Sequence, residues 1–187
     1  MPPLSTDDAI VSRSIALLLE QARRLARRRW RQLVWLQGDA ESCRKMAVGL
    51  WQAQSWSSPL WLGDRAPVAP SLKAGRATTR LGTEHQLVVV DAHEAAGGFN
   101  PDALGAVGGT LMAGGLLVLI TPEQWGTRPD PDYARIADYP SEWTALSAHY
   151  LARLARHLNA STEVIHWTPT ALPRLGRLPT TPAAPEN

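Results

Sequence analysis

Four short runs along this chain are apolar on both faces, and residues 163–167, which also contain polar side chains, are counted as a fifth strand. A strand that alternates apolar and polar residues exposes one face to water, whereas a continuous apolar run is buried on both sides. A sheet is covered on both faces when helices connect its parallel strands. The chain therefore contains the strands of a mostly parallel sheet, predicted at residues 32–37, 59–63, 86–91, 115–121 and 163–167.

The segments between these runs have helical spacing. Apolar residues at intervals of three and four predict a helix over residues 8–29, and the same spacing after Asp39 predicts a second. A third helix is predicted to begin at Pro101, with Asn100 as its N-cap, and to end at Gly114. A fourth follows the fourth run. The alternation predicts an open, doubly wound, mostly parallel α/β sheet flanked by helices, either Rossmann-like or degenerate P-loop-like.

The final stretch has a different composition. Residues 168–187 contain five prolines and show no apolar period. Such a stretch is typical of an extended linker or tail. We therefore expect a single α/β domain over residues 1–167 and a Pro-rich linker or tail over residues 168–187.

Composition also limits the compartment. The single cysteine, Cys43, allows neither an intramolecular disulfide nor a cysteine-rich metal site. No stretch approaches the ~20 apolar residues of a membrane span, and the first residues lack the layout of a signal peptide. We expect a cytoplasmic protein with no metal site and no membrane partner.

The third apolar run ends in Asp-Ala-His, like the acidic motif of nucleotide-driven helicases. Such an ATPase also needs a G-x-x-x-x-G-K-[ST] loop to hold phosphates. The loop after the first run, QGDAESCRKMA, has one glycine, no Lys-Ser or Lys-Thr pair, and two carboxylates, Asp39 and Glu41, placed to repel phosphate. It also lacks the G-x-G-x-x-G of a dinucleotide or S-adenosylmethionine site. We expect no ATP hydrolysis, and interpret Asp91 and His93 either as polar strand ends or as a docking or ligand site.

Arginines gather on the first predicted helix. Arg24, Arg27, Arg28 and Arg31 recur at intervals that place them on one face, opposite the apolar stripe. One interpretation is a solvated helix face, which most charge runs are. The other is an RNA contact, in which arginines bind phosphates without reading sequence.

A third candidate is the loop after the fourth run. Trp125, Arg128 and Tyr133 lie there among prolines, at the carboxyl edge where open α/β sheets bind ligands. These aromatic side chains either stack on bases or fill a partner's pocket, or they fold back onto the core.

The stretch LGTEHQLVVVDAHEAAGGFNPDALGAVGGTLMAGGLLVLITP, together with the later RPDPDYARI, resembles a known family. It is similar to the N-terminal domain of the bacterial tRNA(Met) cytidine acetyltransferases, which form N4-acetylcytidine at the wobble position of elongator tRNA(Met). The likeness covers roughly residues 30–160 and is densest in the Asp-Ala-His, Gly-Phe-Asn-Pro and Ala-Gly-Gly-Leu-Leu-Val-Leu segments.

The resemblance implies a division of labour. In that family the N-terminal domain precedes a helicase-like ATPase module and an acetyltransferase module, on which ATP and acetyl-CoA are expected. The chain itself is then expected to hold no cofactor and no catalytic residue, and to contact tRNA or dock with the other modules. The alternative is an independent α/β protein that binds a nucleotide or another small molecule.

Overall fold

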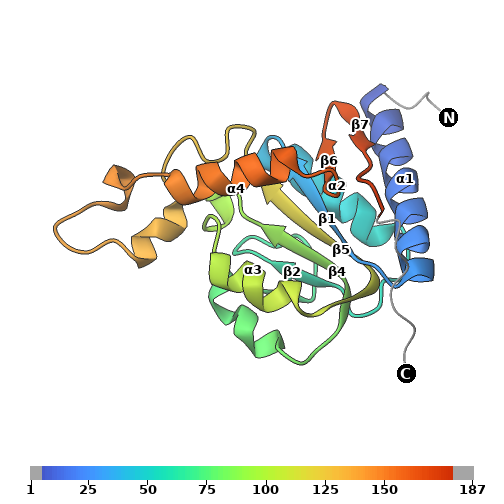
Figure 1. The fold of residues 1–187 in the computed structure, drawn as a ribbon, viewed down its shortest axis with the longest axis horizontal. Coiled ribbons are helices and arrows are strands. Elements are labelled where there is room, and N and C mark those ends of the chain that lie inside the picture. Colours follow the sequence, from blue (N-terminus) through green and yellow to red (C-terminus); the bar gives the residue numbers. More distant parts are fainter. Residues whose placement is uncertain (1–5, 179–187) are drawn as a thin grey trace.

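The structure is a computed structural model that describes residues 6–178. Within this range one sheet has the strand order β3-β2-β4-β5-β1-β6-β7, parallel throughout except for the last pair. Figure 1 shows its arrangement. In chain order the elements are α1 (Thr6–Arg28), β1 (Gln32–Gln37), α2 (Ala40–Gln52), β2 (Leu60–Leu62), β3 (Ser71–Leu72), η1 (Ala74–Arg80), β4 (His85–Asp91), η2 (Glu94–Ala96), α3 (Pro101–Gly108), β5 (Leu111–Thr121), η3 (Pro131–Arg135), η4 (Trp143–Ala145), α4 (His149–Ala160), β6 (Ile165–Thr168) and β7 (Ala171–Arg174).

Successive side chains of the central strands enter two separate cores. In β4, Leu87 and Val89 face the core that α1 and α2 cover, whereas Val88 and Val90 face the core that α3, α4 and η1 cover. This alternation explains why the strand reads as a continuous apolar run, since both of its faces are buried. The predicted open α/β fold with a mostly parallel sheet between helices is confirmed.

One predicted helix boundary is wrong. The helix that begins at Pro101 ends at Gly108 rather than Gly114, because a second glycine follows at once and adjacent glycines weaken a helix. Residues from Leu111 onward already belong to β5. Gly114 lies at an irregularity of the β4–β5 pairing, with φ +79°, and a Cβ there would lie 2.7 Å from the Cβ of Ala26. The glycine therefore lets α1 pack directly against the strand.

The region predicted to be a linker contributes a strand. β7 pairs antiparallel with β6, so the sheet continues past Trp167. Pro173 lies in this edge strand, where a missing N–H is tolerated. The strand also packs against α1, which brings the first and last described elements together. Residues 179–187 of the predicted tail lie outside the described residues.

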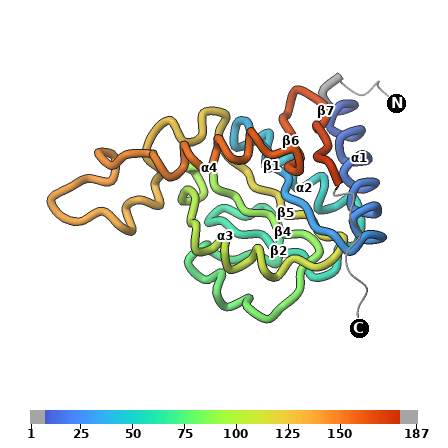
Figure 2. The backbone as a smooth tube through the Cα atoms, in the orientation of Figure 1, coloured from blue at the N-terminus to red at the C-terminus, as the bar shows by residue number. Residues whose placement is uncertain are grey.

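A long connection between β5 and α4 projects from the body of the protein. We call residues 129–148, which include η3 and η4, the arm. Figures 1 and 2 show it at one end of the long axis, with α1 at the other end. The two ends of the molecule are therefore formed by different elements and can present different surfaces.

Candidate functional site

The carboxyl ends of β1 and β5 mark the point where an open α/β sheet usually binds its ligand. From β1 the chain enters α2 on one face of the sheet, and from β5 it reaches α4 on the other. Here the protein itself fills that point. The N–H of Gly38 donates to the carbonyl of Thr121 at 3.2 Å, and Pro169 covers the glycine, since a Cβ on Gly38 would lie 2.9 Å from the proline ring.

The N-terminus of α2, where a P-loop would hold phosphate, is capped from within the chain. The carboxylate of Asp39 accepts a hydrogen bond from the N–H of Ser42 at 2.9 Å. This hydrogen bond lowers the pKa of Asp39, so the cap is negatively charged at neutral pH. A phosphate would have to displace that carboxylate, which agrees with the absence of a P-loop sequence.

Asp91, the acidic residue of the Asp-Ala-His segment, is buried in an ion pair. Its Oδ2 lies 2.5 Å from Nε of Arg44 on α2, and its Oδ1 accepts from the N–H of His93 at 3.2 Å. The Asp91 side chain is fully buried. Removing one member of such a pair costs about 3–5 kcal/mol, because the other charge stays buried without a partner. Asp91 is thus engaged in holding α2 against β4.

The residues that follow Asp91 tie two loops together. His93 is the N-cap residue of η2, and the carboxylate of Glu94 lies 2.7 Å from the guanidinium of Arg128. Both members of this ion pair are largely exposed, so its contribution to stability is small. The predicted residues His93 and Arg128 therefore lie at the same edge of the sheet as Asp91, on the surface above it.

Trp125 and Tyr133 fold back onto the core. Trp125 packs edge to face on Trp35, with ring centroids 6.2 Å apart, and on Phe99, at 5.1 Å. Tyr133 is buried as well, and burial raises the pKa of its phenol. These rings fill space between the sheet and α4, as the second of the two predicted alternatives for this loop describes, and the Tyr133 ring also lines a pocket at the surface.

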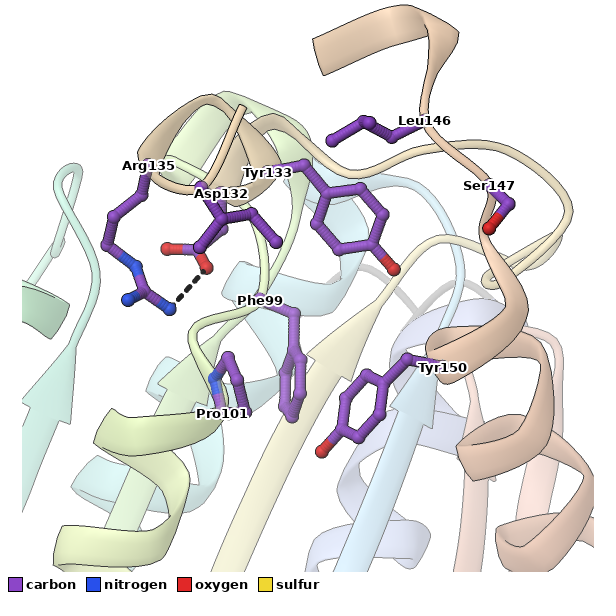
Figure 3. Close-up of a pocket in the computed structure, with 9 residues that line it drawn as sticks. Phe99, Pro101, Asp132, Tyr133, Arg135, Leu146, Ser147 and Tyr150 are labelled. Carbon is purple, nitrogen blue, oxygen red and sulfur yellow. Dashed lines mark hydrogen bonds and ion pairs between the residues drawn. The ribbon is translucent and has the colours of Figure 1, made fainter. Parts of the chain in front are cut away.

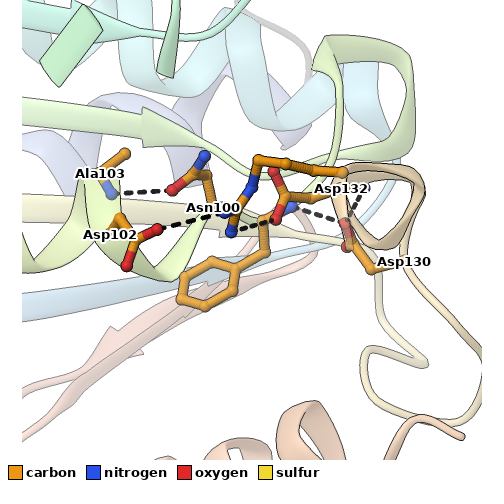
Figure 4. A network of polar contacts seen from close by, with 7 residues as sticks. Asn100, Asp102, Ala103, Asp130 and Asp132 are labelled. Carbon is orange, nitrogen blue, oxygen red and sulfur yellow. Dashed lines mark hydrogen bonds and ion pairs between the residues drawn. The ribbon is translucent and has the colours of Figure 1, made fainter. Parts of the chain in front are cut away.

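One buried carboxylate anchors the start of the arm. Oδ1 of Asp130 accepts hydrogen bonds from the N–H groups of Phe99 at 2.8 Å and Asp132 at 2.9 Å. Figure 4 shows Asp130 beside Asp132 in this network of polar contacts. Burial raises the pKa of Asp130 to about 6. Nearby, the guanidinium of Arg135 lies 3.3 Å from the carboxylates of both Asp102 and Asp132. These contacts join the arm to the start of α3.

The position of the Asp130 carboxylate also explains why residue 98 is a glycine. Gly98 has φ +83°, and a Cβ there would lie 1.9 Å from Oδ1 of Asp130. Only glycine permits both the backbone conformation and the approach of the carboxylate.

The predicted arginine face forms one wall of a groove. Arg24, Arg27 and Arg28 of α1 line it together with Gln21, and the C-terminal segment after β7 supplies the opposite wall. The volume is about 640 Å³. We call it the arginine groove; its lining residues are Gln21, Arg24, Arg27, Arg28, Leu175, Gly176 and Leu178.

Arg31, the fourth predicted arginine, has another role. Its Nη1 donates to the carbonyl of Leu111 at 2.7 Å, which ties the end of α1 to the start of β5. It lines a smaller neighbouring cavity together with Arg177. Arg177 is not among the predicted site residues, because it lies in the stretch predicted to be a linker.

Residues 6–178 lack two kinds of feature. They contain no helix that is long and apolar enough to cross a membrane. They also contain no group of three or more His, Cys, Asp or Glu side chains arranged to hold a metal ion. Cys43 is a buried residue of α2, and burial raises the pKa of its thiol to about 12, so it is not a thiolate at neutral pH.

A family model and similar curated proteins carry the same description. Residues 10–169 match the sequence model described as "tRNA(Met) cytidine acetyltransferase TmcA, N-terminal". A protein of that name from Citrobacter koseri is 36% identical over 141 residues, which are 73% of this chain and 20% of the relative. One from Nitrosococcus halophilus is 36% identical over 138 residues, 72% of this chain and 18% of the relative. The chain thus spans about a fifth of the length of these curated relatives.

Proposed function

The chain belongs to the family of N-terminal regions of tRNA(Met) cytidine acetyltransferases, and from that premise we propose that it is an accessory, RNA-contacting domain of such an enzyme. The complete enzyme would form N4-acetylcytidine at the wobble position of elongator tRNA(Met). In this proposal ATP and acetyl-CoA bind to helicase-like and acetyltransferase modules, and this domain docks with them and holds RNA. The cytoplasmic location stays a prediction.

The observation that carries the RNA role is the arginine groove. Three arginines of α1 line one wall of this groove, and a guanidinium group is suited to phosphate because it can form two parallel hydrogen bonds to it. Arg24 is paired with Glu20, an exposed i,i+4 contact that an incoming phosphate can replace at little cost. The groove reads no base, so binding should be indifferent to sequence and sensitive to salt.

The carboxyl ends of β1 and β5, where a nucleotide would bind, are filled by the protein's own groups. This argues against the alternative of an independent nucleotide-binding protein. Asp39 caps α2, Arg44 neutralises Asp91, and Pro169 covers Gly38. A nucleotide would have to displace three groups that already have partners. The geometry therefore favours a domain that keeps the nucleotide-binding shape without its site.

The test is a titration of tRNA at several salt concentrations. We expect the logarithm of the affinity for tRNA to fall linearly with the logarithm of the salt concentration. In a variant with Arg24, Arg27 and Arg28 all changed to Ala, this slope should be less steep by about 2, at roughly 0.7 for each of the three lost phosphate contacts. A matched control changes three exposed arginines outside the groove to Ala: Arg76, Arg153 and Arg156. If both triple variants lose tRNA affinity equally, binding depends on the net charge of the protein alone, and the proposal for the groove would fail.

A further inference from the structure

An apolar pocket of about 420 Å³ lies between the arm, the start of α3 and the start of α4. Figure 3 shows the rings of Phe99, Tyr133 and Tyr150 around one space. Arg135 and Asp132 stand on one side of it, and Leu146 and Ser147 on another. The volume is in the range of pockets that hold a small ligand or a large side chain.

The pocket continues into exposed apolar surface on the arm. Ile136, in the pocket lining, is 60% exposed, and Tyr150 is 52% exposed. Tyr139, on the arm, is 99% exposed. Apolar and aromatic side chains that gather on a projecting segment mark surfaces that contact a partner.

The charge of the arm, which supplies much of the pocket lining, indicates the kind of partner. The arm contains four carboxylates, Asp130, Asp132, Asp138 and Glu142, and a single basic residue, Arg135. That arginine already lies between the carboxylates of Asp132 and Asp102. The arm therefore repels phosphate and attracts cations, in contrast to the arginine groove.

We propose that this pocket binds a polypeptide segment that carries a large apolar side chain flanked by lysine or arginine. The apolar side chain enters between Phe99, Tyr133 and Tyr150, and the flanking cations face Asp138 and Glu142. This inference extends the docking role proposed above. It rests on that role only for the statement that the segment belongs to the other modules of the enzyme. The chemistry of the pocket does not depend on it.

Binding of defined peptides to the whole chain tests the chemistry. The probe is a fluorescent peptide, Gly-Lys-Arg-Leu-Trp-Lys-Arg-Gly, followed by anisotropy at low salt. A charge-reversed peptide replaces its basic residues with glutamate, and a third peptide replaces Leu-Trp with Ala-Ala. We expect saturable binding of the first peptide and at least tenfold weaker binding of each of the others. Equal binding of the charge-reversed peptide, or no saturation by the first peptide up to millimolar concentration, would overturn the proposal.

Substitutions locate the binding. A variant with Ile136→Ser and Tyr150→Ser alters two exposed side chains of the pocket and should weaken the first peptide at least fivefold. The matched control is Leu81→Ser, which alters a side chain that is 63% exposed and outside the pocket. A variant with Asp138→Asn and Glu142→Gln should weaken binding about threefold. If the pocket variant binds the peptide as the parent does, the peptide lies elsewhere and the inference fails.

Two outcomes separate this inference from the RNA proposal. Loss of RNA binding in the Ile136 and Tyr150 variant, with peptide binding unchanged, would assign the pocket to an unpaired base instead and overturn the inference. If the arginine-groove variant keeps its RNA affinity while the peptide results hold, only the RNA proposal fails.

Discussion

The arginine groove and the arm lie at opposite ends of the molecule and are built in different ways. The groove carries its charges on the exposed face of a 23-residue helix whose other face is packed on the sheet. The arm has two short 3-10 turns, and a buried carboxylate, Asp130, joins its start to α3. The exposed charges of Arg24 and Arg27 can therefore be removed at little cost to the fold, whereas the pocket and the attachment of the arm share residues. Stability measurements should separate the two ends.

The largest expected effect is at the anchor of the arm. Gly98→Ala places a Cβ 1.9 Å from the Asp130 carboxylate and in a left-handed conformation, so it should lower the free energy of unfolding by about 3 kcal/mol or more. Urea denaturation measures this.

The control for that substitution lies nearby in α3. A Cβ at Gly105 would meet no atom within 4 Å, and alanine in a helix is more stable than glycine by about 0.5–1 kcal/mol. Gly105→Ala should therefore stabilise the protein. A mild effect of Gly98→Ala, similar in size to that of Gly105→Ala, would show that the arm is not held through Asp130.

An intermediate effect should come from pH. The pKa of Asp130 is about 6 in the folded protein and 3.8 in its ordinary state, so between these values the folded state retains a proton that the unfolded state has released. Stability from this group is thus present below pH 4 and is lost as the pH rises to about 6, by up to about 3 kcal/mol.

The comparison variant is Asp130→Asn, whose Oδ1 can still accept both backbone hydrogen bonds but does not titrate. The difference in unfolding free energy between parent and variant should shift in favour of the variant from pH 4 to pH 7. Parallel pH profiles for the two proteins would contradict the raised pKa.

The smallest effects are expected at the arginine end. Arg24→Ala with Arg27→Ala should change the unfolding free energy by no more than about 0.5 kcal/mol, because both side chains are exposed. Arg31→Ala should cost about 1 kcal/mol, since it removes the hydrogen bond to the Leu111 carbonyl. Thermal denaturation of the variants measures both. A larger loss from the Arg24 and Arg27 pair than from Arg31 would make the groove a structural feature.

Local pattern predicted the sheet well and its edges poorly. The runs around Val34, Val89 and Val118 identify strands because each strand is apolar on both faces. The strand β7 escaped prediction because it contains a proline and its pairing depends on the hairpin with β6. The end of α3 was misplaced because the apolar spacing of a short helix continues into Leu111 of β5.

Contacts between distant residues decided the candidate site. Asp91 and Arg44 are 47 positions apart, and no spacing rule joins them. Trp125 was predicted to lie at the carboxyl edge of the sheet. Whether its ring faces solvent depends on Trp35 and Phe99, which contact it only in the folded protein. Three of the four predicted arginines share one groove because they lie on one helix. The helical repeat places residues three and four apart on the same face, so this grouping could be predicted from the sequence.

The two walls of the arginine groove have a consequence for folding kinetics. One wall is residues 21–28 and the other is residues 175–178, which pass so close to the body that a Cβ at Gly176 would lie 2.2 Å from the carbonyl of Glu163. Contacts of such high sequence separation form late, because closing a long loop costs entropy before any contact offsets it. The groove therefore exists only in a chain whose sheet is already assembled. Recovery of RNA binding after dilution from urea should follow the slowest refolding phase, and the groove would distinguish a finished domain from a nascent one.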